Sequence, residues 1–150
     1  MCAVLVFVEG VRIRNSGPFH SPMLRPTLTA QQGTAIAVFE SVPLSQDAVM
    51  PDERGVVTTS APDGSKVLVG RSQREAGGQN STLILEVVDT SKSGGGESDK
   101  CTYWTFLSLD NAVNGDAELP LFKKPVLMAP ASGSGVRKEH SYLSVRIRLS

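Results

Sequence analysis

A chain of 150 residues, of which 40% are hydrophobic, is long enough to bury one self-sufficient core. Lysine plus arginine number 15, as do aspartate plus glutamate, so the formal net charge is zero. This balance argues against nucleic-acid binding over the whole surface, although it is compatible with a local basic patch. We therefore expect a single domain that spans residues 1–150.

The cysteines and the apolar segments indicate the compartment. Cys2 and Cys101 are too few for a disulfide framework or a zinc site, so we expect two free thiols, or at most one pair. Met1–Val8 is apolar but lacks a basic beginning and stops at Glu9, which favours a strand over a signal peptide. No apolar run approaches the ~20 residues that span a bilayer. We expect an intracellular protein that does not enter a membrane.

Short apolar runs separated by turn residues predict an all-β fold. The expected strands are Ala3–Val8, Val11–Arg14, Thr34–Val42, Gly55–Ser60, Lys66–Val69, Thr82–Asp89, Cys101–Asp110, Pro125–Ala129 and Ser141–Leu149. Eight or nine short strands with turn signals between them are typical of an antiparallel β-sandwich or jelly roll. At most a single helical turn is expected, over Ser45–Glu53.

The last expected strand alternates apolar and polar side chains without a break. Successive strand side chains point to opposite faces, so one set faces a core and the other faces outward. The core set is Leu143, Val145, Ile147 and Leu149, and the outward set is Ser144, Arg146, Arg148 and Ser150. The pattern predicts a half-buried strand with arginines in a row on its exposed face.

Glycine and proline mark irregular positions near the beginning of the chain. Glu9-Gly10 separates the first two apolar runs and predicts a bulge or a tight turn. Asn15–Pro26 holds three prolines, Pro18, Pro22 and Pro26. Because proline cannot donate to a strand ladder, we expect no central strand in this segment.

Catalytic chemistry has few candidates in this sequence. The two histidines, His20 and His140, both fall in expected loops or at a strand boundary, where solvated side chains are the rule. The sequence has no Gly-x-Ser-x-Gly elbow, phosphate-binding glycine loop or metal-ligand spacing. We expect a protein that is not an enzyme and that carries no cofactor or metal.

The arginines of the last strand are candidate partner-binding residues. Arg146 and Arg148, with Arg137 and Lys138 nearby, would contact phosphates or an acidic partner. The alternative is a solvated sheet face, or one that pairs with carboxylates of a neighbouring strand. Aromatic platforms for stacking single-stranded bases are scarce, which makes nucleic acid the less expected partner.

Lys66–Ser72 supports a further hypothesis. A strand that ends in Gly70-Arg71-Ser72 resembles the forkhead-associated phosphothreonine reader, in which an arginine after the strand grips phosphate. Asn111–Gly115 is similar to the later Asn-Gly turn of that family, whereas its Ser-x-x-His motif is missing here. The resemblance implies a phosphothreonine-peptide reader that uses Arg71.

The order of strands and loops from about residue 38 to residue 150 resembles the nucleoplasmin core domain. The similar segments are Val38–Leu44, Lys66–Gln73, Leu83–Val88, Ser91–Lys100, Tyr103–Leu109, Glu118–Phe122, Gly133–Gly135 and Tyr142–Leu149. The first occupies the place of that family's opening strand, although its Trp and Gly are absent. The fourth is the polar loop that carries the family's first acidic tract.

This resemblance implies a jelly-roll sandwich that assembles with copies of itself as a ring, usually a pentamer. It also implies a histone chaperone or a scaffold of the nucleus. Glu97 and Asp99, in the loop of the first acidic tract, would pair with histones or other basic proteins. Residues 1–37 are then an N-terminal extension with one or two extra strands.

Overall fold

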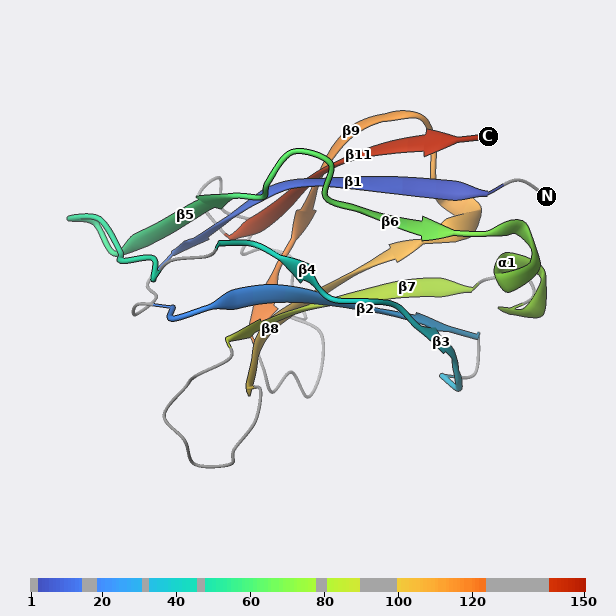
Figure 1. The fold of residues 1–150 in the computed structure, drawn as a ribbon, viewed down its shortest axis with the longest axis horizontal. Coiled ribbons are helices and arrows are strands. Elements are labelled where there is room, and N and C mark those ends of the chain that lie inside the picture. The colour runs from blue at the N-terminus through green and yellow to red at the C-terminus, as the bar shows by residue number, and fades with distance from the viewer. Residues whose placement is uncertain are drawn as a thin grey trace, which may run out of the picture.

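The fold consists of two antiparallel sheets that face each other across a hydrophobic core (Figure 1). The computed structural model describes residues 3–14, 19–30, 33–45, 48–77, 81–89, 100–123 and 141–150. Within these ranges nearly all of the regular structure is β, with one short α-helix and one 3₁₀ turn. The expected all-β class and the antiparallel sandwich are confirmed.

The first sheet is organised around β1 (Val4–Arg14). On one side β1 pairs with β11 (Tyr142–Leu149), which in turn pairs with β9 (Gly115–Pro120). On the other side, β5 (Val56–Ser60) pairs with the second half of β1 and β6 (Lys66–Val69) with its first half. The segment 1–37 therefore contributes the strand that joins the parts of this sheet.

The second sheet is built around β2, β7 and β8. Its order is β10 (Phe122–Lys123), β8 (Lys100–Ser108), β7 (Thr82–Asp89), β2 (Pro22–Thr29) and β3 (Ala35–Val38), with β4 (Val42–Pro43) also paired to β2. The helix α1 (Arg71–Gly77) connects β6 to β7, and the 3₁₀ turn η1 (Leu109–Asn111) connects β8 to β9. Both segments therefore carry the chain from one sheet to the other.

Alternation of buried and outward-facing side chains along the strands produces the core. On β11, Leu143, Val145 and Ile147 are buried, whereas Arg146 and Arg148 are exposed, as the sequence pattern predicts. On β8, Tyr103 and Leu107 face the core, and Trp104 and Phe106 face outward. Each sheet thus presents one apolar face to the other sheet and one face to solvent.

The irregularity at Glu9-Gly10 is a β-bulge within a continuous strand. The pairing of β1 with β11 shifts register between Val8 and Gly10. A Cβ atom on Gly10 would collide with the carbonyl oxygen of Thr59 on β5. Glycine is therefore required at this position because the backbone of a neighbouring strand approaches it closely. The bulge is one of the two alternatives that the sequence predicts.

The expectation that prolines exclude a central strand over Asn15–Pro26 is wrong, because β2 begins at Pro22 and lies between β7 and β3. The carbonyl oxygens of Pro22 and Pro26 accept the N–H groups of Leu44 and Phe39, at 2.9 and 3.1 Å. The nitrogen and the carbonyl of one strand residue point to the same side. The two proline nitrogens, which carry no N–H, therefore face β3 and β4, and the pairing of β2 with β7 continues without a register shift from Pro22 to Thr29.

Several other element predictions need correction. The single strand expected over Thr34–Val42 is divided into β3 and β4. The described part of Ser45–Glu53 forms no helical turn; instead, Val49 forms an isolated β-bridge with Phe19. The helix α1 and the strands β9 and β10 are absent from the prediction, because they are short and have no clear apolar period. The expected strand Pro125–Ala129 lies outside the described residues.

Candidate binding surfaces

The outer side of the first sheet carries the arginines that the sequence singles out. In one cross-strand row, Lys66 of β6 is paired with Phe7 of β1, Phe7 with Arg146 of β11, and Arg146 with Asp116 of β9. The Arg146 guanidinium lies over the Phe7 ring, 5.1 Å from its centroid. The structure shows no ion pair between Arg146 and Asp116, so the ring holds this guanidinium.

A second cross-strand row contains the other arginine. Leu68 of β6 is paired with Leu5 of β1, and Leu5 with Arg148 of β11. Leu68 is 53% exposed and Leu5 is half-buried. We call these two rows (Lys66, Phe7, Arg146 and Asp116; Leu68, Leu5 and Arg148) the arginine face. It combines cationic groups with an exposed apolar strip.

The outer side of the second sheet is more apolar than the sequence indicates. Trp104 and Phe106 of β8 gather with Phe122 of β10, with ring centroids 5.1 to 6.2 Å apart, and the rings of Phe106 and Phe122 lie within 14° of parallel. Phe106 remains 45% exposed. Their cross-strand neighbours on β7 are Glu86 and Ile84.

The same surface continues across β7 to β2 and β3. Ile84 is paired with Thr27, and Thr27 with Val38, which is 71% exposed. In the adjacent row Glu86 is paired with Arg25, and its Oε1 accepts a hydrogen bond from Arg25 Nε at 3.1 Å. We call this surface the aromatic face; its residues are Phe122, Trp104, Glu86, Arg25, Phe106, Ile84, Thr27 and Val38. Sequence reasoning missed it because Phe122, Ile84 and Val38 are far apart in the chain.

Arg71, the candidate phosphate-binding residue, is the first residue of α1 and is exposed. One helical turn later, Arg74 is largely buried: its guanidinium donates to the carbonyl oxygen of Leu109 at 3.0 Å and lies 4.0 Å from Asp110. Asn114 belongs to the Asn111–Gly115 segment that is similar to the Asn-Gly turn of the forkhead-associated family. Its Oδ1 accepts the N–H of Leu149 at 2.7 Å. The helix is thus packed against η1, and Arg71 is left outside this contact.

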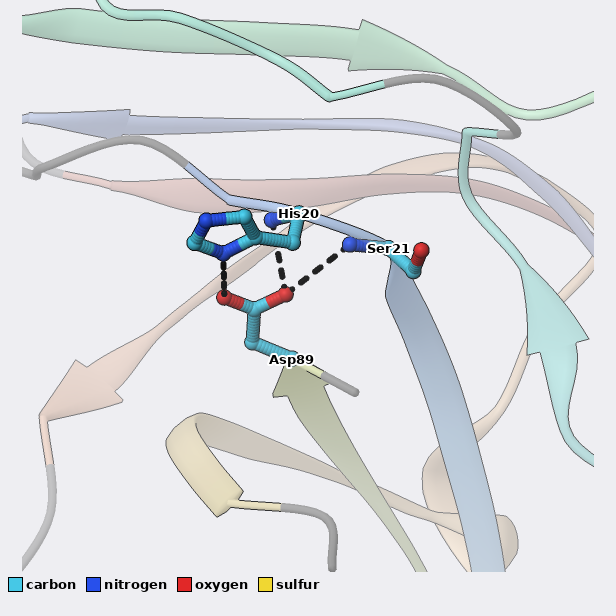
Figure 2. Close-up of polar contacts among 3 residues, drawn as sticks. All are labelled: His20, Ser21 and Asp89. Carbon is cyan, nitrogen blue, oxygen red and sulfur yellow. Dashed lines mark hydrogen bonds and ion pairs between the residues drawn. The ribbon is translucent and has the colours of Figure 1, made fainter. Parts of the chain in front are cut away.

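His20 takes part in a polar contact that fixes the entry to β2 (Figure 2). One carboxylate oxygen of Asp89, at the end of β7, accepts the backbone N–H groups of His20 and Ser21 at 2.9 and 3.0 Å. The other oxygen lies 3.7 Å from Nδ1 of His20, whose side chain is 62% exposed. This contact ties the start of β2 to the end of β7.

Several predicted functional residues lie outside the described residues. These are Glu97 and Asp99 of the expected acidic loop, Arg137 and Lys138, His140, Cys2 and the Gly133–Gly135 segment. Of the candidate binding residues, the structure therefore places Arg146, Arg148 and Arg71. Arg146 and Arg148 lie together on the arginine face, and Arg71 lies on a different element.

The part of the chain that the structure describes contains no group of three or more His, Cys, Asp or Glu side chains that could hold a metal ion. Its helical segments are too short to span a bilayer.

No protein-family model matches the sequence, and a search of curated proteins finds no significant match. The nucleoplasmin resemblance therefore rests on the order of strands and loops alone.

Proposed function

We propose that the protein is a non-enzymatic interaction module that associates with a second copy of itself through the aromatic face. One observation carries the proposal: a solvated sheet surface presents three clustered aromatic rings together with the 71% exposed Val38. Contiguous apolar patches of this kind are characteristic of interaction sites, whereas scattered exposed apolar residues are ordinary.

The arrangement of the aromatic face fits a copy of the same face. A two-fold axis parallel to the strands, between β7 and β2, would place Phe106 of one copy opposite Val38 of the other. The same axis would place Glu86 opposite Arg25 of the other copy, so that opposite charges meet. Isologous interfaces have this self-complementary character.

This mode of association differs from the ring that the nucleoplasmin resemblance implies. A five-membered ring joins two different surfaces of each chain, whereas a two-fold contact uses one surface twice. The geometry of the aromatic face favours pairs. Histone binding stays an expectation, since the acidic residues that would support it, Glu97 and Asp99, lie outside the described residues.

The test is the mass of the protein in solution, measured by light scattering over a range of concentrations at about micromolar levels and above. We expect a species with twice the mass of one chain that dissociates on dilution. The double substitution Phe106→Ser with Val38→Ser should produce a monomer. Its matched control is Leu68→Ser with Val113→Ser, because these residues are 53% and 68% exposed but lie outside the aromatic face.

The outcomes separate the alternatives. A wild-type monomer at all concentrations would overturn the proposal. So would equal dissociation by the test and control pairs, which would indicate non-specific association. An assembly of five chains that survives the Phe106 and Val38 substitutions would exclude the aromatic face and favour the ring.

A further inference from the structure

The arginine face borders a hollow that is rich in hydrogen-bond donors. The hollow has a volume of about 500 Å³, opens to solvent and lies where the end of β11 meets the start of β9. Its lining residues are Asn114, Gly115, Arg146, Ile147, Arg148 and Leu149. No carboxylate lines it. Two arginines therefore line this concave surface, and Asp116, which is paired with Arg146 on β9, is not among its lining residues.

Two of the polar side chains of this hollow, Arg146 and Asn114, are held by contacts within the sheet. The Arg146 guanidinium lies over the Phe7 ring. The Leu149 N–H donates to Oδ1 of Asn114, which leaves the amide NH₂ of Asn114 free to donate. Arg148 follows Arg146 on the same face of β11, at about 7 Å along an extended strand. Three donor groups with fixed backbone positions suit oxyanions, which accept several hydrogen bonds at once.

The residues around the hollow indicate which class of oxyanion it suits. Arg148 is paired across the strands with Leu5, and Leu5 with the exposed Leu68, so an apolar strip begins next to the guanidinium groups. A nucleic acid would offer bases to stack, but the ring of Phe7 is already covered by Arg146. An acidic segment of a protein offers carboxylates and apolar side chains together.

We propose that this hollow binds the carboxylates of an extended acidic peptide segment that lies along the boundary between β11 and β1. Its acidic side chains then point toward Arg146 and Arg148, and its alternate, apolar side chains point toward the Leu5–Leu68 strip. Side chains on one face of an extended peptide repeat at about 7 Å, which matches the separation of Arg146 and Arg148. This site is on the sheet opposite the aromatic face, so self-association and peptide binding are independent of each other.

The experiment measures binding of a fluorescein-labelled peptide in which Glu and Leu alternate, by fluorescence anisotropy with the full chain. A peptide with Gln in place of Glu is the control ligand. We expect Arg146→Gln and Arg148→Gln each to weaken binding about two- to fivefold, as for partly exposed ion pairs. Binding should also weaken as salt is raised.

The matched control variants are Arg54→Gln and Arg71→Gln, which remove an exposed arginine elsewhere while making the same change in net charge. Both should bind the Glu–Leu peptide as the wild type does. Circular dichroism melting of each variant distinguishes loss of the site from loss of the fold.

The remaining outcomes overturn the proposal. Equal weakening by the Arg148 and Arg54 variants would indicate non-specific attraction. Equal affinity for the Gln peptide would exclude carboxylates, and tighter binding of single-stranded oligothymidine or of anionic phospholipid vesicles would assign the face to a different partner. Loss of binding in the Arg71 variant alone would place the anion site on α1. None of these results depends on the oligomeric state.

Discussion

The guanidinium carbon of Arg146 lies 5.1 Å from the centroid of the Phe7 ring, and the two residues are direct cross-strand partners of β11 and β1. The contact stabilises a cation on an exposed sheet surface where no ion pair holds it. Ring and cation therefore depend on each other: the ring orients the guanidinium, and the guanidinium covers part of the half-buried ring.

A double-mutant cycle of Phe7→Leu and Arg146→Gln should show a coupling free energy of about 0.5–1 kcal/mol, because each substitution removes the same cation–π contact. The free energy of unfolding in urea gives the four values needed. Phe7→Tyr keeps an aromatic face and should retain the coupling. A coupling of zero would mean that the contact is incidental.

Replacing Asp89 by alanine should lower the free energy of unfolding by about 1–2 kcal/mol, since the backbone N–H groups of His20 and Ser21 would lose a charged acceptor. The matched control is Asp63→Ala, which removes an exposed aspartate from a turn and should change stability by less than about 0.5 kcal/mol. Urea unfolding monitored by tryptophan fluorescence measures both. Equal effects would show that the Asp89 contact contributes nothing.

Gly10→Ala should destabilise the fold by about 1–3 kcal/mol or more, because the new methyl group meets the Thr59 carbonyl rather than a flexible side chain. Gly70→Ala is the control: its Cβ would lie at an ordinary 3.6 Å from Gln73 Oε1. This variant should be neutral or slightly stabilised, as expected when alanine reduces the freedom of the unfolded chain. The thermal melting midpoint should therefore fall for Gly10→Ala and stay unchanged or rise slightly for Gly70→Ala.

Asp52 should contribute a measurable dependence of stability on pH. The backbone N–H groups of Val56 and Arg54 donate to its carboxylate and hold the pKa of Asp52 below its ordinary 3.8. A depressed folded-state pKa stabilises the fold at pH values above 3.8, and this contribution disappears as pH falls through the folded-state pKa. Wild type should thus lose more stability below about pH 4 than Asp52→Asn does. Urea midpoints at several pH values test this, and parallel curves would contradict it.

The parts of the fold that follow from local alternation were predictable from the sequence. The exposed Arg146 and Arg148 and the buried residues between and beside them follow from a period of two, as does the long strand β7. The strand β2 was not predictable, because the effect of a proline on a strand depends on which side its missing N–H would face and on how that side is paired. On that side β2 pairs with the short strands β3 and β4, whose pairing with β2 cannot be read from the proline positions.

The two binding surfaces also differ in how far the sequence predicts them. Arg146 and Arg148 are neighbours along one strand, so their sequence pattern places both on one face. The aromatic face draws residues from five strands, β10, β8, β7, β2 and β3, and its existence depends on strand order. The hollow beside Arg148 depends likewise on Asn114 and Gly115, which reach β11 only because β9 pairs with it.

The prolines of β2 have a consequence for aggregation. Because the nitrogens of Pro22 and Pro26 cannot donate, the strands beyond β2 are the four-residue β3 and the two-residue β4 instead of one long strand. A short, interrupted edge is a poor template for further strands, and fibril growth begins by adding strands to edges. The second sheet can thus present an apolar face to a partner while its β3–β4 border resists open-ended polymerisation.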